Sequence, residues 1–189
     1  MKKEIGPIPY VYPIPITLVG AVVGGKPNFA TIGDVGLMGI RPPLVAVSLH
    51  ERHHTTPGIL ECRTFSINFP TTAMLAETDY CGMVSGSEVD KAALFTLFYG
   101  KLETVPMIAE CPVNLECRVV RDFAIRLRHI FIGEVVQTHV AEQLVAESGD
   151  GIADLGALDP VIYSLDNRYY RIGEAIGTGY SEGKTLADG

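Results

Sequence analysis

Residues 16–32 read ITLVGAVVGGKPNFATI, two runs of strand-forming residues on either side of a turn signal. The first run is rich in β-branched residues, and Gly24-Gly25-Lys26-Pro27 ends it with residues that favour tight turns. The second run begins at once and extends from Asn28 to Ile32. The stretch therefore predicts a β-hairpin near the start of the chain.

Further strand signals follow this hairpin. Pro42-Pro43 introduces a nearly continuous apolar run at residues 44–49, and residues 64–69 alternate in polarity before Pro70. Both patterns are typical of strands. Four later runs have the same character: residues 115–120, 130–136, 161–165 and 169–172. So many short strands predict a mostly β, antiparallel, barrel-like sheet, because a doubly wound fold would need long helices between its strands.

A few short helices and a single domain complete the predicted organisation. One helix is expected over residues 73–78 and another over residues 90–99. The length of the chain, without a long polar linker, favours one domain over residues 1–189. Residues 1–13 are expected to form an extended, proline-punctuated lead-in, and the glycine-rich residues 177–189 to form a flexible tail.

The composition predicts a folded core with an acidic surface. Hydrophobic residues make up 47% of the chain, and 15 Lys and Arg against 22 Asp and Glu give a net charge of −7. Such a surface repels nucleic acid and anionic membranes, so an anionic ligand must be held by a local group of cations and backbone donors. Four cysteines without a CxxC pair predict reduced thiols. Prolines interrupt the N-terminus where a signal peptide needs an unbroken apolar segment, and the apolar runs are too short to span a membrane, so a cytoplasmic protein is expected.

The most basic short window of the chain follows the apolar run at residues 44–49. Residues 48–56 read SLHERHHTT and combine cationic side chains, hydroxyls and backbone N–H groups on one segment. A bound phosphate needs these three kinds of donor together. The window therefore predicts a phosphate site, with a solvated loop as the alternative.

Other chemical motifs are weaker. His50, His53 and His54 lack a nearby Asp that would complete a familiar triad of ligands, so no metal site is expected. Residues 82–86, GMVSG, do not have the GxSxG spacing of a nucleophile elbow and favour a turn, either against a ligand or on the surface. Cys81, beside that turn, is either a redox thiol or a small apolar filler. Neither glycine-rich stretch has the spacing of a dinucleotide-binding fingerprint.

Seven short motifs occur in order between about residues 10 and 180. They are Asn28-Phe29-Ala30-Thr31, Pro42-Pro43-Leu44-Val45-Ala46-Val47-Ser48, Arg52-His53-His54-Thr55-Thr56, Phe65-Ser66-Ile67-Asn68, Cys81-Gly82-x-x-Ser85-Gly86-x-x-x-Asp90-Lys91, Cys117-Arg118-Val119 with the strand from His129 to Val135, and Tyr169-Tyr170-Arg171-Ile172-Gly173. In this order they resemble the flavin reductase-like, FMN-binding split-barrel family, and within it the flavoredoxin branch.

The resemblance implies a Greek-key split barrel that forms a homodimer, with one FMN near each subunit interface. It also implies that Asn28, Ala30 and Thr31 lie against the isoalloxazine and ribityl groups. The other implied site residues hold the ribityl and phosphate groups (Ser48, Arg52, His53, His54, Thr55 and Thr56) or close the pocket (Asn68, Ser85, Gly86 and Lys91). FMN is then the cofactor, and NADH, NADPH or a redox protein is the electron partner. Because flavin carries the redox chemistry itself, no catalytic dyad is needed.

Three functions remain open from the sequence. The first is an FMN-dependent oxidoreductase that acts in electron transfer or in NAD(P)H-dependent flavin reduction. The second is a non-catalytic module that binds FMN or haem on the same barrel. It stays open because Gly33-Asp34-Val35 follows Thr31, where many relatives have an aromatic residue. The third is a thiol-based redox protein that uses Cys81.

Overall fold

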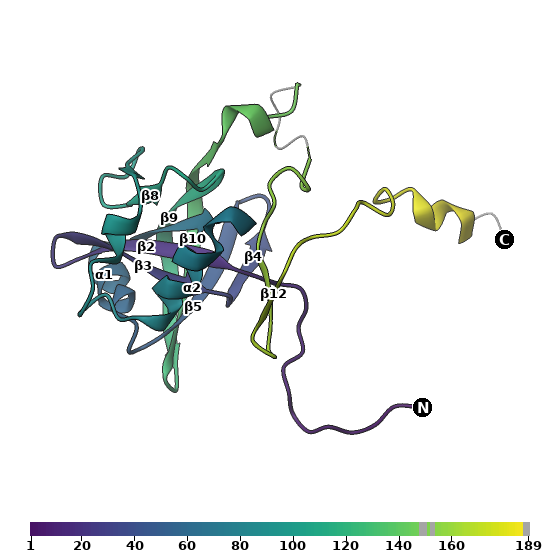
Figure 1. Ribbon diagram of the computed structural model, residues 1–189, viewed down its shortest axis with the longest axis horizontal. Coiled ribbons are helices and arrows are strands. Elements are labelled where there is room, and N and C mark those ends of the chain that lie inside the picture. The colour runs from purple at the N-terminus through teal and green to yellow at the C-terminus, as the bar shows by residue number, and fades with distance from the viewer. Residues whose placement is uncertain (148–150, 152–153, 187–189) are drawn as a thin grey trace.

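A seven-stranded antiparallel sheet forms the body of the protein, whose computed structural model describes residues 1–147, 151 and 154–186 (Figure 1). Its strand order is β3-β2-β6-β9-β10-β5-β4. The strands are β2 (Thr17–Val23), β3 (Lys26–Ile32), β4 (Val35–Gly39), β5 (Leu44–His50), β6 (Thr64–Phe69), β9 (Val113–Ile125) and β10 (Arg128–Val140). Every pairing in this sheet is antiparallel, so the mostly β class predicted from the sequence is confirmed.

Two small sheets and several short helices surround this body. Strands β1 (Ile14–Pro15), β11 (Ile162–Ser164) and β12 (Arg168–Tyr170) form one small sheet, in the order β1-β11-β12, and strands β7 (Leu97–Phe98) and β8 (Met107–Ile108) form the other. The α-helices are α1 (Thr55–Cys62) and α2 (Leu75–Met83). The described 3₁₀ helices are η1 (Thr72–Met74), η2 (Lys91–Leu94), η3 (Glu142–Leu144) and η4 (Glu182–Leu186).

The hairpin predicted over residues 16–32 is the pair β2–β3. Thr17 lies opposite Ile32, and the turn contains Gly24 and Gly25, both at positive φ, a conformation that favours glycine. Strand β3 is at one end of the sheet. One row of its backbone N–H and C=O groups therefore lies outside the hydrogen-bonded ladder.

Strand β4 is at the other end of the sheet, and its edge is irregular. Its register against β5 shifts between Leu37 and Gly39. The side chains of Leu37 and Met38 are 71% and 57% exposed. The sheet therefore ends here on a short strand with apolar side chains on its surface.

The main core lies inside the curled sheet. All seven strands contribute side chains to one apolar cluster, which requires the sheet to wrap around its inner face. Phe65 and Phe131 are fully buried in this cluster, and each such side chain stabilises the fold by about 2–3 kcal/mol. The long hairpin of β9 and β10 bends where its register shifts between Ile132 and Gly133. A Cβ at Gly133 would lie 2.6 Å from Phe65 Cζ, so glycine lets the bent strand pass this ring.

The helices differ from those predicted. Residues 90–99 contain only η2, and Leu97 and Phe98 pair with β8, because these apolar side chains pack on a strand partner that the local sequence does not reveal. The helix expected at residues 73–78 is displaced toward the C-terminus: α2 continues to Met83 and includes part of the predicted glycine turn. Helix α1 is missing from the expectations, because Pro57 and Gly58 in its first turns resemble a turn signal.

Two segments extend away from the body on the same side (Figure 1). Residues 1–13 are exposed, as expected for the lead-in. Arg171 is still attached to the body, because it donates from Nη2 to Thr72 Oγ1 at 2.6 Å, but the described side chains from Gly173 onward are exposed. The flexibility of the tail stays a prediction, and its last residues, 187–189, lie outside the described residues. In the described part of the chain, no helix is long and apolar enough to cross a membrane.

Candidate functional site

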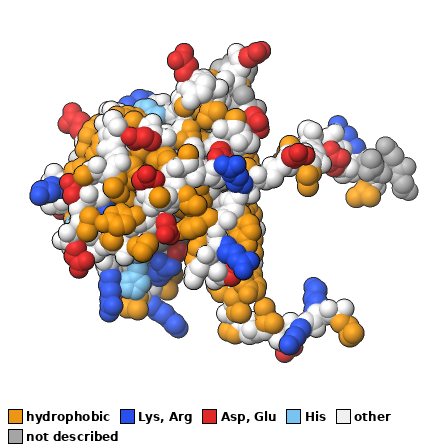
Figure 2. All heavy atoms as spheres, viewed as in Figure 1, with side chains coloured by type: hydrophobic (Ala, Val, Ile, Leu, Met, Phe, Trp, Pro, Cys, Tyr) orange, Lys and Arg blue, Asp and Glu red, His pale blue; other side chains and the backbone are white. Residues whose placement is uncertain are grey.

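A hollow of about 180 Å³ lies where β3, the loop before α1 and the end of α2 meet. Most of the predicted site residues line it. Its lining residues are Ala30, Thr31, Arg52, His53, His54, Cys81, Gly82, Met83, Val84, Ser85, Gly86 and Lys91. We call it the cationic hollow, because its charged side chains are basic and none of its lining residues is acidic. Lys, Arg and His side chains also gather at one lower edge of the body (Figure 2).

The loop between β5 and α1 is shaped by hydrogen bonds to His50. The backbone N–H of His53 donates to His50 O at 2.9 Å, and that of Arg52 donates to His50 Nδ1 at 3.1 Å. Helix α1 begins directly afterwards, at Thr55, with neither a capping side chain nor an acidic residue in its first turn. The partial positive charge of its N-terminus is therefore not neutralised within the helix.

Asn28 and Gly86 bring three segments together beside the hollow. Asn28 is buried and donates from Nδ2 to Thr55 Oγ1 at 2.8 Å, which ties β3 to the first turn of α1. A Cβ at Gly86 would lie 1.9 Å from Asn28 Oδ1, so only glycine allows the loop after α2 to approach this closely. The neighbouring Ser85 hydroxyl shares a hydrogen bond with that of Ser87 at 2.7 Å. The predicted glycine–serine turn is thus packed against the site.

The ring of His53 contains an unsatisfied polar atom. Its Nδ1 is buried and has no hydrogen-bond partner in the described structure. Burial lowers the pKa of His53 below its usual value, and the positive charges of His50, Arg128 and Lys91 add to this effect. A buried ring nitrogen without a partner costs about 1–3 kcal/mol, which a ligand can remove by forming the missing hydrogen bond.

Lys91 is a buried cation beside the hollow. It is only 4% exposed, and its Nζ donates to Cys81 O at 2.9 Å and to Val84 O at 3.2 Å. No carboxylate pairs with Nζ in the part of the chain that the structure describes. Burial lowers the pKa of Lys91, because the charged form loses hydration. A bound anion would supply the counter-charge that the chain itself does not place here.

Cys81 lines the hollow, but its thiol is not activated. The residue is 2% exposed, and burial raises its pKa to about 11 even though Lys91 lowers it in part. The thiol is therefore protonated at neutral pH, whereas the thiolate is the reactive form. These properties favour the small apolar filler over the redox thiol. All four cysteines of the chain are free.

Five predicted residues do not line the cationic hollow: Asn28 and Asn68, and the three hydroxyl residues Ser48, Thr55 and Thr56. Thr56 is buried, and its hydroxyl donates to His50 O at 3.0 Å. Thr55 is also buried and accepts the bond from Asn28. Ser48 lines a different hollow, of about 410 Å³, between the N-terminal lead-in and β5. The two threonines therefore shape the start of α1, and direct contact with a ligand in the cationic hollow falls to residues 52–54.

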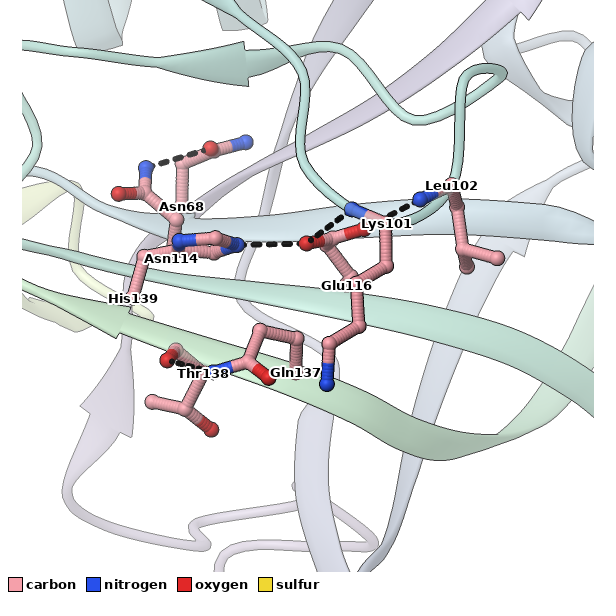
Figure 3. A network of polar contacts seen from close by, with 8 residues as sticks. All are labelled: Asn68, Lys101, Leu102, Asn114, Glu116, Gln137, Thr138 and His139. Carbon is pink, nitrogen blue, oxygen red and sulfur yellow. Dashed lines mark hydrogen bonds and ion pairs between the residues drawn. The ribbon is translucent and has the colours of Figure 1, made fainter.

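Asn68 belongs to a separate buried network (Figure 3). Its Oδ1 accepts from Asn114 Nδ2 at 2.8 Å and from the Ile108 N–H at 3.1 Å, and its Nδ2 donates to Leu18 O at 2.7 Å. Asn68 is fully buried, and all of these partners belong to the protein core. The structure thus does not bring Asn68 to the cationic hollow, contrary to the expectation that it closes the pocket.

A second hollow, of about 510 Å³, continues from the first toward the β11–β12 hairpin. The two hollows share Thr31, Gly82 and Met83. Tyr169 OH donates to Asp79 Oδ1 at 2.6 Å and so joins the hairpin to α2. Burial, and then the bond to Asp79, raise the pKa of Tyr169, so its phenol stays protonated. We call this space the hairpin hollow.

The wall of the hairpin hollow could not be recognised from residue chemistry in the sequence. Tyr163, Leu165, Asn167 and Tyr169 form this wall, opposite Asp79 of α2. Tyr169 is the first residue of the last quoted motif, which is the one signal that pointed to this wall. Asp79 carried no signal, because a carboxylate near a helix end is usually just solvated.

A third hollow, of about 240 Å³, adjoins the cationic hollow on its other side. The two share His54, Gly86 and Lys91, and the third adds Lys26 together with the acidic Glu88 and Asp90. The three hollows therefore follow one another along the same surface. They suit an elongated ligand with its anionic group in the middle or at one end.

The donor set of the site suits binding rather than side-chain catalysis. Arginine, imidazole and ammonium groups beside a helix N-terminus are what a phosphate dianion requires. Among the described residues, no group of three or more His, Cys, Asp and Glu side chains could hold a metal ion. The hairpin hollow adds a partly aromatic wall that a planar ring can contact.

Comparison with known proteins defines the class to which this fold and this site belong. The model of the family described as "Flavin reductase like domain" matches residues 10–172. The chain belongs to this family. The resemblance noted from the seven motifs is confirmed, and so is the split-barrel fold.

Solved structures are similar to the chain over nearly its whole length. Flavoredoxin from Methanosarcina acetivorans is 40% identical, with a TM-score of 0.93 over 98% of this chain and 99% of that one. Flavoredoxin of Desulfovibrio vulgaris (Miyazaki F) is 32% identical, with a TM-score of 0.89 over 97% and 100%. An FMN-binding protein from Thermus thermophilus is 25% identical, with a TM-score of 0.79 over 94% and 98%.

A relative with a named activity matches a shorter part of the chain. The reductase component of 4-nitrophenol 4-monooxygenase/4-nitrocatechol 2-monooxygenase from Rhodococcus opacus is 33% identical over 124 residues, which is 65% of this chain and 63% of that protein. The family is thus related to reductase components of monooxygenases.

Proposed function

We propose that this protein binds FMN as a homodimer and uses it in electron transfer or in NAD(P)H-dependent flavin reduction. The observation that carries the proposal is a buried ring nitrogen without a hydrogen-bond partner next to a buried cation without a counter-charge, both in the cationic hollow of the described structure. Among the described residues, the buried Nδ1 of His53 has no hydrogen-bond partner and the buried cation of Lys91 has no carboxylate. One phosphate dianion would satisfy both, because it supplies acceptor oxygens and negative charge together.

The three hollows support the orientation of the cofactor. The phosphate is assigned to the cationic hollow, where Arg52, His53, His54 and Lys91 provide cationic or imidazole donors. The isoalloxazine ring is assigned to the hairpin hollow, which opens from it past Thr31. Ala30 and Thr31 lie on the end strand β3, whose free backbone row can supply further donors.

When bound, FMN would supply the redox chemistry, and the protein supplies binding and surroundings. Lys91 contributes positive charge that favours the anionic phosphate. Tyr169 and Asp79 hold the hairpin against α2, so that the hairpin hollow keeps its shape and excludes water. Cys81 stays a protonated thiol and takes no part in the electron transfer.

The relatives favour FMN and a redox role. The structure from Thermus thermophilus is described as an FMN-binding protein, and two similar structures are flavoredoxins. The relative from Rhodococcus opacus is a reductase component. FAD is the competing cofactor, because the third hollow continues beyond the position assigned to the phosphate.

The test is binding of flavins to cofactor-free protein, measured by calorimetry. We expect FMN to bind at least about 100-fold more tightly than riboflavin, since only FMN has the phosphate. Equal affinity for FMN and riboflavin would overturn the phosphate assignment, and tighter binding of FAD would overturn the choice of FMN. Addition of NADH or NADPH to the loaded protein then separates the functions: reduction of the flavin supports the oxidoreductase, and a flavin that no donor reduces supports the non-catalytic module.

A further inference from the structure

The C-terminal tail is anchored to the body at one point and then released. Arg171 bonds to Thr72 Oγ1 and pairs with Asp159 at 3.3 Å. Beyond this anchor, Ile176 and Tyr180 are fully exposed and Leu186 is 86% exposed. Burial of these three side chains against a partner would be favourable, because it removes apolar surface from water.

An apolar groove lies at the root of this tail. It has a volume of about 630 Å³ between the N-terminal lead-in and the β11–β12 hairpin. Its largest side chains are Tyr10, Tyr12, Tyr163, Leu165 and Tyr170. We call it the tyrosine groove. Tyr10 and Tyr12 stack with 5.7 Å between their ring centroids, so the lead-in presents a flat aromatic surface rather than separate side chains.

The tail, the lead-in and the groove lie on one side of the molecule. Both extensions leave the body on the side of β12 (Figure 1), and apolar side chains gather along that side (Figure 2). The two extensions also differ in charge. The lead-in carries Lys2 and Lys3 against Glu4, whereas the described part of the tail carries Glu174 and Glu182 against Lys184. In a two-fold dimer built on this side, the net positive lead-in of one copy can therefore lie beside the net negative tail of the other.

We propose that residues 173–186 of one copy lie in the tyrosine groove of a second copy, and the reverse. The proposal rests on the homodimer of the proposed function and adds the segment that forms it. A two-fold arrangement uses both extensions of both chains and buries Ile176, Tyr180 and Leu186 against aromatic rings. It is self-complementary, so association stops at two copies.

The exchange also reaches the candidate flavin site. Tyr163 and Leu165 line both the tyrosine groove and the hairpin hollow. A tail from the second copy therefore presses on the outer side of the same hairpin whose inner side faces the position assigned to the isoalloxazine ring. We therefore expect the tail exchange to affect flavin affinity as well as dimer formation.

The first experiment measures the dimer dissociation constant of the full chain by sedimentation equilibrium. The variant Ile176→Ser/Tyr180→Ser/Leu186→Ser is expected to weaken the dimer by about 30-fold or more, because three anchoring side chains are lost. The matched control is Leu60→Ser/Leu94→Ser, which removes exposed apolar side chains from α1 and η2 and should change the constant less than about threefold. Thermal unfolding monitored by circular dichroism confirms that each variant is folded.

The second experiment identifies whose groove the tail occupies. A photo-crosslinking residue at position 180 is placed in chains of ordinary isotope composition, which are mixed with ¹⁵N-labelled chains that lack the crosslinker. Crosslinked peptides that join position 180 to ¹⁵N-labelled segments from residues 10–12 or 162–170 support the exchange. Crosslinks confined to the same chain would overturn it, because the tail then covers its own groove.

The outcomes separate this inference from the proposed function. A dimer that persists unchanged in the triple variant overturns the tail exchange and leaves the homodimer and the flavin site standing. A monomer at all concentrations in the unaltered chain overturns the homodimer and the exchange together. In that case flavin binding is still decided by calorimetry on the monomer.

Discussion

Two buried polar clusters of this protein differ in whether their polar atoms find hydrogen-bond partners within the protein. In the first, Glu116 on β9 is fully buried, and its carboxylate accepts from His139 Nε2 at 2.5 Å, from the Leu102 N–H at 2.7 Å and from the Lys101 N–H at 3.1 Å (Figure 3). In the second, the cationic hollow, the ring nitrogen of His53 lacks a partner. The first cluster is complete without a ligand and the second is not.

The presence or absence of such partners distinguishes structural residues from ligand-binding residues more reliably than residue type does. Asn68 and Lys91 were both expected at the site, and both are polar and buried. Asn68 has all of its partners within the core, so its role is structural. Lys91 has carbonyl partners but no counter-charge, so its role is best explained by a ligand. The predictions below test this contrast.

Substitution Glu116→Ala should have the largest effect, and it should fall on stability. It leaves the N–H groups of Lys101 and Leu102 and the ring of His139 without their acceptor. We expect the free energy of unfolding in urea to fall by about 3 kcal/mol. Flavin affinity of the folded protein should not change.

The control for this substitution is Gln137→Ala, whose side chain only donates to Thr138 O at 2.9 Å on the surface. It should alter the free energy of unfolding by less than about 0.5 kcal/mol. If Glu116→Ala weakened flavin binding and left the free energy of unfolding unchanged, the structural role assigned to the Glu116 cluster would be contradicted.

Substitution Lys91→Met should affect binding and spare stability. Loss of the buried cation is expected to weaken FMN affinity by about 100-fold, since a charged hydrogen bond to phosphate disappears. The free energy of unfolding of the cofactor-free protein should change by less than about 1 kcal/mol, because burial of an uncompensated charge is also removed. Calorimetry measures the FMN affinity, and urea unfolding measures the free energy of unfolding. The matched control is Lys26→Met, because Lys26 lines the adjoining hollow only. An equal loss of FMN affinity in this variant would show that the overall positive charge of the region, and not Lys91 itself, determines binding.

The pH dependence of binding should report on His53, with a smaller effect. Its pKa is lowered in the cofactor-free protein, and a phosphate beside Nδ1 would raise it, so a proton is taken up on binding. FMN affinity should therefore rise about threefold as the pH falls from about 8 to 6.5. Riboflavin, or the variant His53→Asn with FMN, should show no such rise.

The same lowered pKa affects the stability of the cofactor-free protein in the opposite direction. Below about pH 6.5 the unfolded chain binds a proton on His53 that the folded chain does not, so stability falls as the pH decreases through that range. The His53→Asn variant should lose this part of the pH dependence. A pH profile of stability that is identical in both proteins would contradict the assigned shift.

Substitution Cys81→Ala should have the smallest effect. The buried thiol is protonated at neutral pH, since its pKa is about 11. The rate of flavin reduction by the best donor should stay within about twofold of the unaltered protein, measured by stopped-flow absorbance. Loss of turnover with FMN still bound would show that the thiol takes part and would restore the third hypothesis.

Local sequence signals predicted most strands of the large sheet, but they missed β4 and the short strands β1, β7 and β8, and they predicted the helices poorly. Residues 16–32 specify their hairpin through neighbouring residues, and β2–β3 pairs as expected. The helix predicted at residues 90–99 is wrong, because Leu97 and Phe98 pair with β8, ten residues further along the chain. Helix α1 fails for a related reason: Pro57 and Gly58 suggest a turn, but burial of Ile59 in the main core stabilises the helix.

The site was predictable where one segment supplies it. Residues 52–54 are adjacent in sequence and face the hollow together, as the basic window suggested. The wall from Tyr163 to Tyr169 was not predictable from residue chemistry, because it meets Asp79 only after the chain returns to α2. Asn68 lies away from the cationic hollow, because a buried asparagine can be satisfied by the core as well as by a ligand, and the sequence does not show which.

The irregular edge of β4 has a consequence for aggregation. An exposed edge strand with apolar side chains is a template on which further chains can add strands without limit. The register shift between Leu37 and Gly39 breaks the regular row of free backbone groups that such growth requires. Exposed Leu37 and Met38 can then contribute to side-chain contacts without extending the sheet. A single displaced residue thus makes β4 a poorer template for the addition of further strands.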